Sequence, residues 1–293
     1  MQHKFSGLGV AMVTPFNSDD TVDFAGLARL TEYLIAGGVD YLVVQGTTGE
    51  SATLTKDEKI DVLEHVKDVN NSRLPIVFGH GGNNTAELVN GFKKYDFEGV
   101  DAILSASPYY NKPTQEGIYL HYKALSEASP VPIILYNVPG RTASNVSAAT
   151  TLRLANDFKN IIAIKEASGN LGQISQILKQ RPKGFAVISG DDPLVVPHIA
   201  IGGDGVISVI GNATPKVFSK MVKDALKGDF AAAAKTHLLV LDLIDLLFVE
   251  GNPGGIKAAL EIKKVCGAAL RLPLAGVSKA TYDAIAKEIK DLD

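Results

Sequence analysis

The sequence predicts an α/β protein, a closed (β/α)8 TIM barrel with a C-terminal helical extension. Three observations support this prediction. Short β-branched runs alternate with longer stretches of helical periodicity, which indicates parallel strands joined by helices. Eight such units precede Gly228 without a break in composition, as a closed barrel requires. No GxGxxG turn follows any strand, which disfavours the open doubly wound sheet that is the alternative.

The expected strands are short and mostly apolar. They span residues 7–13, 41–44, 75–78, 102–106, 132–137, 161–166, 185–189 and 205–210. Apolar side chains at helical spacing predict a helix after each strand. Thr55 with Glu58, and Asn84 with Glu87, have the spacing of helix-capping residues. We expect the second of these helices to run to about Phe97.

Beyond Gly228 the sequence is helical, with helices expected at 230–249, 256–265 and 277–289. Because no polar linker intervenes, we expect residues 229–293 to pack on a barrel formed by residues 1–228. Cys266 is the only cysteine, so an internal disulfide is excluded. We expect it to be a packing residue in an amphipathic C-terminal helix.

Composition and charge exclude several classes of function. The net charge is -3, from 29 basic and 32 acidic side chains without a basic stripe, which excludes a nucleic-acid partner. No cysteine or histidine cluster has the spacing of a metal site. The longest apolar run, 238–249, is too short to span a membrane. With no secretory signal pattern, a cytoplasmic protein is expected.

Lys165 is the first candidate for chemistry, because it ends the buried sixth strand. Side chains alternate along a strand, so Lys165 should share a face with Ile161 and Ala163, and Glu166 should point the other way. Burial of an ammonium group is costly and favours the neutral amine, which is a nucleophile for carbonyl carbon. The alternative is a lysine that extends its charged end into solvent.

Four further side chains follow strand ends, where the active sites of such barrels lie. Thr47 and Thr48 lie in a Gly-Thr-Thr-Gly turn that would hold a carboxylate, or would only satisfy backbone groups. Tyr136 would pass protons in the barrel mouth, or be a core aromatic. Arg141 suits a carboxylate, or forms a surface salt bridge. Together with Lys165 these groups indicate Schiff-base chemistry on an α-keto acid.

Two loops offer alternatives. Glycine turns at 190 and 211 follow strands seven and eight, where barrels often bind phosphate. They would suit a barrel that binds a phosphosugar or flavin. Tyr109 and Tyr110 project from the loop after strand four and would form part of the site or an interface pair.

Four runs resemble those of the dihydrodipicolinate synthase family, lysine-dependent members of the pyruvate aldolase superfamily. They are GTTGES at 46–51, PYYNKPTQEG at 108–117, YNVPGRT at 136–142 and IKEASG at 164–169. The resemblance covers nearly the whole chain. It implies that pyruvate condenses with aspartate semialdehyde, in lysine and diaminopimelate biosynthesis, without a cofactor and in a homotetramer built from tight dimers. The second hypothesis is a related lyase of a sialic or keto-deoxy sugar acid. N-acetylneuraminate lyases lack an arginine at the position of Arg141, which favours the synthase over the lyase. A catalytically dead regulatory homologue is a further one.

The resemblance implies four catalytic residues. Lys165 would form the Schiff base with pyruvate, and Tyr136 would shuttle protons and orient the keto acid. Thr47 would link Tyr136 to Tyr110, and Tyr110 would come from a neighbouring subunit.

The resemblance also implies four substrate-binding residues. Thr48 would hold the pyruvate carboxylate, and Arg141 would receive the carboxylate of aspartate semialdehyde. The backbones of Gly190 and Ile207 would line the pocket.

Two departures from the family pattern stand out. Family members that lysine inhibits bind it at positions that match Ser51, Ala52, Lys56, Lys59, Asn83, Glu87 and Tyr109. Lys56 and Lys59 stand where some inhibited members carry histidines, and added cations should repel lysine, so we predict weak or absent feedback inhibition. Gly254–Gly255 replaces a stiffer apolar dipeptide found in many members, for which we have no functional account from sequence.

Overall fold

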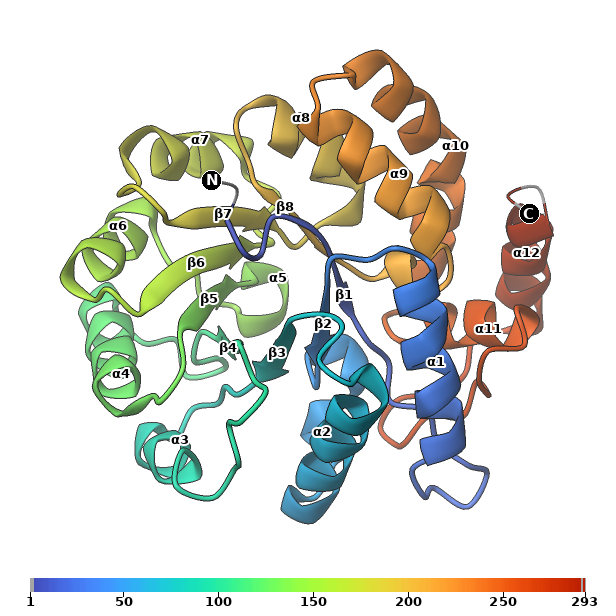
Figure 1. Cartoon of the computed structure of the whole chain (residues 1–293), viewed down its shortest axis with the longest axis horizontal. Helices are drawn as coiled ribbons and strands as arrows, with labels where there is room; N and C mark the ends of the chain where they lie inside the picture. The colour runs from blue at the N-terminus through green and yellow to red at the C-terminus, as the bar shows by residue number, and fades with distance from the viewer. Residues whose placement is uncertain (1–2, 291, 293) are drawn as a thin grey trace.

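A computed structural model describes residues 3–290 and 292. Eight parallel strands close into a barrel in which each strand pairs with the next and β8 pairs with β1, which confirms the predicted fold (Figure 1). The strands are β1 (Gly7–Ala11), β2 (Tyr41–Val44), β3 (Ile76–Gly79), β4 (Ala102–Ala106), β5 (Ile133–Asn137), β6 (Ile161–Glu166), β7 (Ala186–Ser189) and β8 (Gly205–Ser208).

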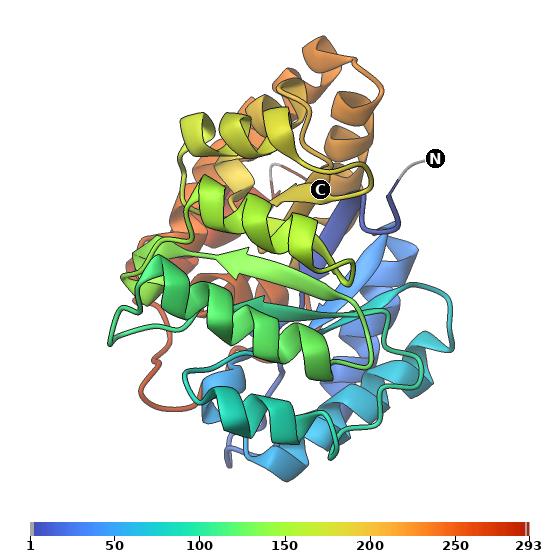
Figure 2. The ribbon, with the colours of Figure 1, turned by 90° about the vertical axis from the view of Figure 1, so that its left-hand side faces the viewer.

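Helices connect the strands and surround the barrel. Figure 2 shows one flank, where α4, α6 and α7 pack side by side. The helices of the barrel are α1 (Phe24–Ala36), α2 (Lys56–Asn70), α3 (Thr85–Gly91), α4 (Gln115–Ala128), α5 (Pro139–Thr142), α6 (Ala148–Asp157), α7 (Leu171–Gln180), α8 (Val195–Ala200) and α9 (Pro215–Leu226). Short 3-10 turns follow three strands as η1 (Thr47–Gly49), η2 (Ser51–Thr53), η3 (Asp192–Leu194) and η4 (Ile210–Asn212).

Side-chain caps account for where several helices begin. Thr55 and Glu58 form both halves of a capping box at the start of α2, as their spacing predicts. Asn84 accepts a hydrogen bond from the Glu87 amide at the start of α3. Helix α3 nevertheless ends at Gly91, so the prediction of a helix to Phe97 was wrong. A β-carbon at residue 91 would lie 2.7 Å from His80 Cε1, and the residues that follow pack in an aromatic cluster in which Phe92 contacts His80 and Phe97.

Two apolar layers hold the barrel. The interior layer contains Ile134, Tyr136 and Ala163, while a larger outer layer lies between strands and helices. Ile161 belongs to the outer layer, so the prediction that it shares a face with Lys165 was wrong. The reason is a register shift in the β5–β6 pairing, where Ile133 pairs with Ile161 but Ile134 pairs with Ala163. The extra residue breaks the two-residue alternation of the strand.

Three helices follow the barrel, namely α10 (Phe230–Phe248), α11 (Gly254–Ile262) and α12 (Lys279–Lys290). Helix α10 packs on α9, and α11 packs on both α10 and α12. Gly255 permits the close approach of α11 to α10, since a β-carbon there would lie 2.6 Å from the Leu247 carbonyl oxygen. Cys266 is buried as expected, but it lies in the loop after α11 rather than in a helix. No helix within 3–290 is long and apolar enough to cross a membrane.

Candidate active site

Lys165 lies inside the barrel at the carboxyl end of β6. Only 5% of the residue is exposed, so the alternative of a lysine that reaches solvent was wrong. Tyr136 is its register partner on β5, and Lys165 Nζ lies 4.3 Å from the centroid of the Tyr136 ring. Within residues 3–290 and 292, no hydrogen bond or ion pair engages Nζ. The amine is therefore buried, beside a phenol, and open to a ligand.

Gly190 and Ile207 lie on the neighbouring strands. The backbone of Gly190 follows β7, where a β-carbon would lie 2.9 Å from Lys165 Cε and 2.7 Å from Ala167 Cβ. Only a glycine lets the chain pass this close to the aliphatic stem of the lysine. Ile207 is 1% exposed on β8 and belongs to the interior apolar layer.

The two threonines lie in η1, directly after β2. Thr47 is exposed, whereas Thr48 is buried. The side chain of Asn252, from the loop before α11, donates a hydrogen bond from Nδ2 to Thr48 Oγ1 at 3.0 Å. The turn is thus attached to the C-terminal part of the chain. Sequence reasoning missed this contact because 204 residues separate the two partners.

Arg141 and Tyr110 lie on adjacent loops at the same end of the barrel. Arg141 is exposed on α5, and no carboxylate among the described residues pairs with it, unlike the salt bridge considered from sequence. The Tyr110 amide donates to the Thr142 carbonyl at 3.2 Å, which joins the two loops. The Tyr110 side chain is 89% exposed, so within one chain it does not enter the site.

Glu166 points away from Lys165, as the alternation of the strand predicts. Its hydrogen bonds support the segment that follows Arg141. Its buried carboxylate accepts hydrogen bonds from Asn137 Nδ2, Gln173 Nε2 and the Ser168 amide. Asn137 Oδ1 in turn accepts from the Val146 amide at 2.9 Å. The residue after the nucleophile thereby ties β5 and β6 to the segment that follows Arg141.

The phosphate alternative fits the two glycine loops poorly, because their amides already have acceptors within the chain. The Gly190 amide donates to the Glu166 carbonyl at 2.8 Å, and Asp192 Oδ2 accepts from the amides of Val209 and Ile210 at 2.9 Å. Ser208 Oγ accepts from the Gly211 amide. Burial raises the pKa of Asp192, and its bonds to these amides and to Ser208 oppose the rise. The donors of the loop after β8 are therefore occupied by the chain itself.

A buried ion pair supports the threonine turn, and sequence reasoning missed it as well. Glu50 ends the turn and pairs with Lys257 of α11, and both side chains are 0% exposed. Burial lowers the pKa of Lys257, while the charge of Glu50 opposes this effect. A lysine within the apolar run 253–260 was the sequence signal that could have revealed it.

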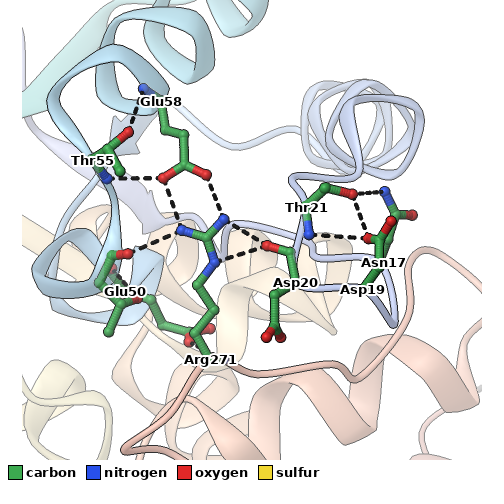
Figure 3. A network of polar contacts seen from close by, with 9 residues as sticks. Asn17, Asp19, Asp20, Thr21, Glu50, Thr55, Glu58 and Arg271 are labelled. Atoms are coloured by element: carbon green, nitrogen blue, oxygen red, sulfur yellow. Dashed lines mark hydrogen bonds and ion pairs between the residues drawn. The ribbon is translucent and has the colours of Figure 1, made fainter.

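Arg271 adds a second, more exposed contact between the same parts of the chain (Figure 3). Its guanidinium donates to both oxygens of Glu58 and to the carbonyl oxygens of Asp20 and Thr53. Its amide donates to Glu50 Oε2 at 3.2 Å. The Arg271 guanidinium lowers the pKa of Glu58 to about 2. The segment after α11 is thereby bound to the start of α2.

Several of the residues at which the resemblance implies a lysine-binding site contact one another. Lys56 Nζ pairs with Glu87 Oε1 at 2.9 Å, and this partner lowers the pKa of Glu87. Burial lowers the pKa of Lys59. Asn83 exchanges two hydrogen bonds with the backbone of Tyr109, at 2.7 and 2.8 Å. Ser51 and Ala52 lie in η2, just before Lys56.

The fold and the site together define a class of protein, a (β/α)8 barrel with a buried, unpaired lysine that can form a Schiff base with a carbonyl compound. A family model described as "Dihydrodipicolinate synthetase family" matches residues 4–292. The chain belongs to this family.

The chain is similar to known members of the family over nearly the whole length of each chain. A 4-hydroxy-tetrahydrodipicolinate synthase of Phocaeicola vulgatus is 52% identical over 293 residues, which is 99% of each chain. The crystal structure of dihydrodipicolinate synthase from Aquifex aeolicus is 39% identical, with a TM-score of 0.95 and 98% of each chain covered. A dihydrodipicolinate synthase variant described as monomeric is 37% identical, with a TM-score of 0.95, and 98% of this chain and 97% of that one are covered.

Proposed function

We propose that this chain condenses pyruvate with L-aspartate 4-semialdehyde to give 4-hydroxy-tetrahydrodipicolinate, the first committed step of lysine and diaminopimelate biosynthesis. Membership of the family supports this reaction. The observation on which the proposed mechanism rests is the buried Lys165 amine, unpaired and 4.3 Å from the Tyr136 ring.

Lys165 is the nucleophile in this mechanism. Its amine attacks C2 of pyruvate and water leaves, which forms an iminium ion. Loss of a proton from C3 gives the enamine, and C3 then bonds to the aldehyde carbon of the semialdehyde. The amino group of the second substrate attacks C2, closes the ring and releases the lysine amine. One water is released overall, and no cofactor is required.

Tyr136 is the proton carrier, because its ring lies against the amine at which protons are gained and lost. Thr48 holds the pyruvate carboxylate, and the backbones of Gly190 and Ile207 line the pocket. Arg141, unpaired and exposed among the described residues, receives the carboxylate of the semialdehyde. This unpaired cation favours the semialdehyde over a sugar aldehyde, which offers hydroxyls instead of a carboxylate.

Tyr110 completes the site from a second subunit. Its exposed side chain lies on a loop fixed to Thr142, so it is presented outward from its own chain toward a neighbour. Thr47, also exposed, links the incoming Tyr110 to Tyr136. We infer a homotetramer built from tight dimers and a location in the cytoplasm.

A steady-state assay with both substrates tests the function. We expect condensation that depends on both pyruvate and aspartate semialdehyde, and none in Lys165→Met. Arg141→Met should raise the KM for the semialdehyde and leave that for pyruvate nearly unchanged. Cleavage of a sialic or keto-deoxy sugar acid without condensation of the semialdehyde would instead support the lyase hypothesis.

A further inference from the structure

We propose that Asn252 is a positioning residue, which sets the direction in which the Thr48 hydroxyl donates its hydrogen bond and so adapts the turn to a carboxylate. The inference rests on the proposed function, because it assumes that Thr48 binds pyruvate. Asn252 lies outside the barrel strands, in the loop between α10 and α11. It reaches the threonine turn across the carboxyl end of the barrel.

The hydrogen bond between the two side chains has a direction. A hydroxyl has one proton to donate and two lone pairs with which to accept. Asn252 Nδ2 donates to Thr48 Oγ1 at 3.0 Å and fills one lone pair. The proton of Thr48 must therefore point elsewhere, and no group within residues 3–290 and 292 accepts it. A buried hydroxyl with a free proton is suited to an anionic acceptor.

Both partners are held in place by a separate contact. Glu50 lies two residues after Thr48, and Lys257 lies five residues after Asn252. Their fully buried ion pair joins the turn to α11. Lys257 Nζ also donates to the Ala269 carbonyl at 2.8 Å and lies 4.2 Å from the centroid of the Phe16 ring. The ion pair thus joins the two segments that carry Asn252 and Thr48.

The other end of the amide shows that packing alone does not explain Asn252. Its Oδ1 is buried and has no hydrogen-bond partner among the described residues. Leaving a buried acceptor unpaired is unfavourable, so a purely structural position would be served better by a smaller or apolar side chain. The feature that the asparagine contributes is its N–H donor.

Two variants of Asn252 separate this role from packing. Asn252→Ala removes the donor and leaves the Thr48 proton free to turn. Asn252→Asp has nearly the same shape, but its carboxylate accepts the proton of the Thr48 hydroxyl. That proton is then no longer available to pyruvate, and a negative charge lies beside the substrate carboxylate. We expect the pyruvate concentration for half-maximal borohydride trapping to rise about 10-fold in Asn252→Ala and about 100-fold in Asn252→Asp. Glu250→Gln, in the same loop but exposed, is the matched control and should leave it unchanged.

A double-mutant cycle with Thr48→Val tests whether Asn252 acts through the hydroxyl. In the Thr48→Val background, Asn252→Ala should have no further effect on pyruvate trapping. An equal effect in both backgrounds, or half-maximal concentrations within twofold of wild type in both Asn252 variants, would overturn the inference. If wild type itself does not trap pyruvate on Lys165, the proposed function fails as well. Asn252→Leu provides a second variant without a donor, of similar shape to asparagine, in case Asn252→Asp does not fold.

Discussion

Replacing Lys257 with methionine should destabilise the protein strongly, although Lys257 takes no part in the proposed chemistry. Methionine keeps the length of the side chain but removes the charge that pairs with Glu50. The Glu50 carboxylate, with a side chain 0% exposed, then keeps the Arg271 amide at 3.2 Å but loses its cation. Breaking one side of a buried ion pair costs about 3–5 kcal/mol, because the remaining charge stays desolvated.

This free energy corresponds to a measurable change in melting temperature. With an unfolding entropy of about 2.1 cal/mol/K per residue, a chain of 293 residues should melt about 5–8 °C lower. Scanning calorimetry at pH 7 measures the shift. Lys279→Met is the control, since Lys279 is 86% exposed in its pair with Asp283 and its loss should lower the melting temperature by less than about 1 °C.

A second variant separates the ion pair from packing. Glu50→Gln/Lys257→Met removes both charges, so it should cost less than the sum of the two single substitutions. Additive costs, or a Lys257→Met melting temperature equal to that of the Lys279→Met control, would refute the reasoning. Lys257→Met alone should also raise the KM for pyruvate, because α11 and the threonine turn lose the ion pair that joins them.

Three further predictions concern other parts of the molecule. Gly190→Ala should lower kcat about 100-fold, because the new β-carbon would lie 2.9 Å from Lys165 Cε and displace the amine. Steady-state kinetics on the folded variant checks this, and a kcat within twofold of wild type would contradict it. The pKa of Glu58 is lowered from 4.5 to about 2 by Arg271, so this contact contributes stability above pH 4.5 that is lost as the pH falls toward 2. Urea unfolding of Arg271→Met should accordingly show a shallower loss of stability between pH 4.5 and 2, and a slope equal to that of wild type would contradict it. L-lysine at about 1 mM should not slow the reaction, because Lys56 already forms an ion pair with Glu87 and its charge would repel a cationic ligand. Clear inhibition below that concentration would show the charge argument to be wrong.

Most of the architecture follows from patterns that act over short distances in the chain. Strands β2, β4 and β6 lie at the predicted residues because β-branched runs and turn residues delimit them. In a parallel barrel the carboxyl ends of the strands share one rim, so the proximity of Lys165 and Tyr136 followed from their places on β6 and β5.

The failures have physical causes that the sequence does not display. The extra residue in the β5–β6 pairing moves Ile161 to the outer layer, and strict alternation cannot anticipate such a bulge. Helix α3 ends at Gly91, and the residues beyond it pack in an aromatic cluster with His80 that local periodicity does not display. Asn252 and Lys257 act on a turn about 200 residues away, so no local pattern marks them.

Borohydride reduction in the presence of pyruvate alone, followed by peptide mass mapping, tests the mechanism most directly. We predict one pyruvyl adduct per chain, on Lys165, and none in Lys165→Met. An adduct on another lysine, or none at all, would contradict the assignment of Lys165 as the nucleophile.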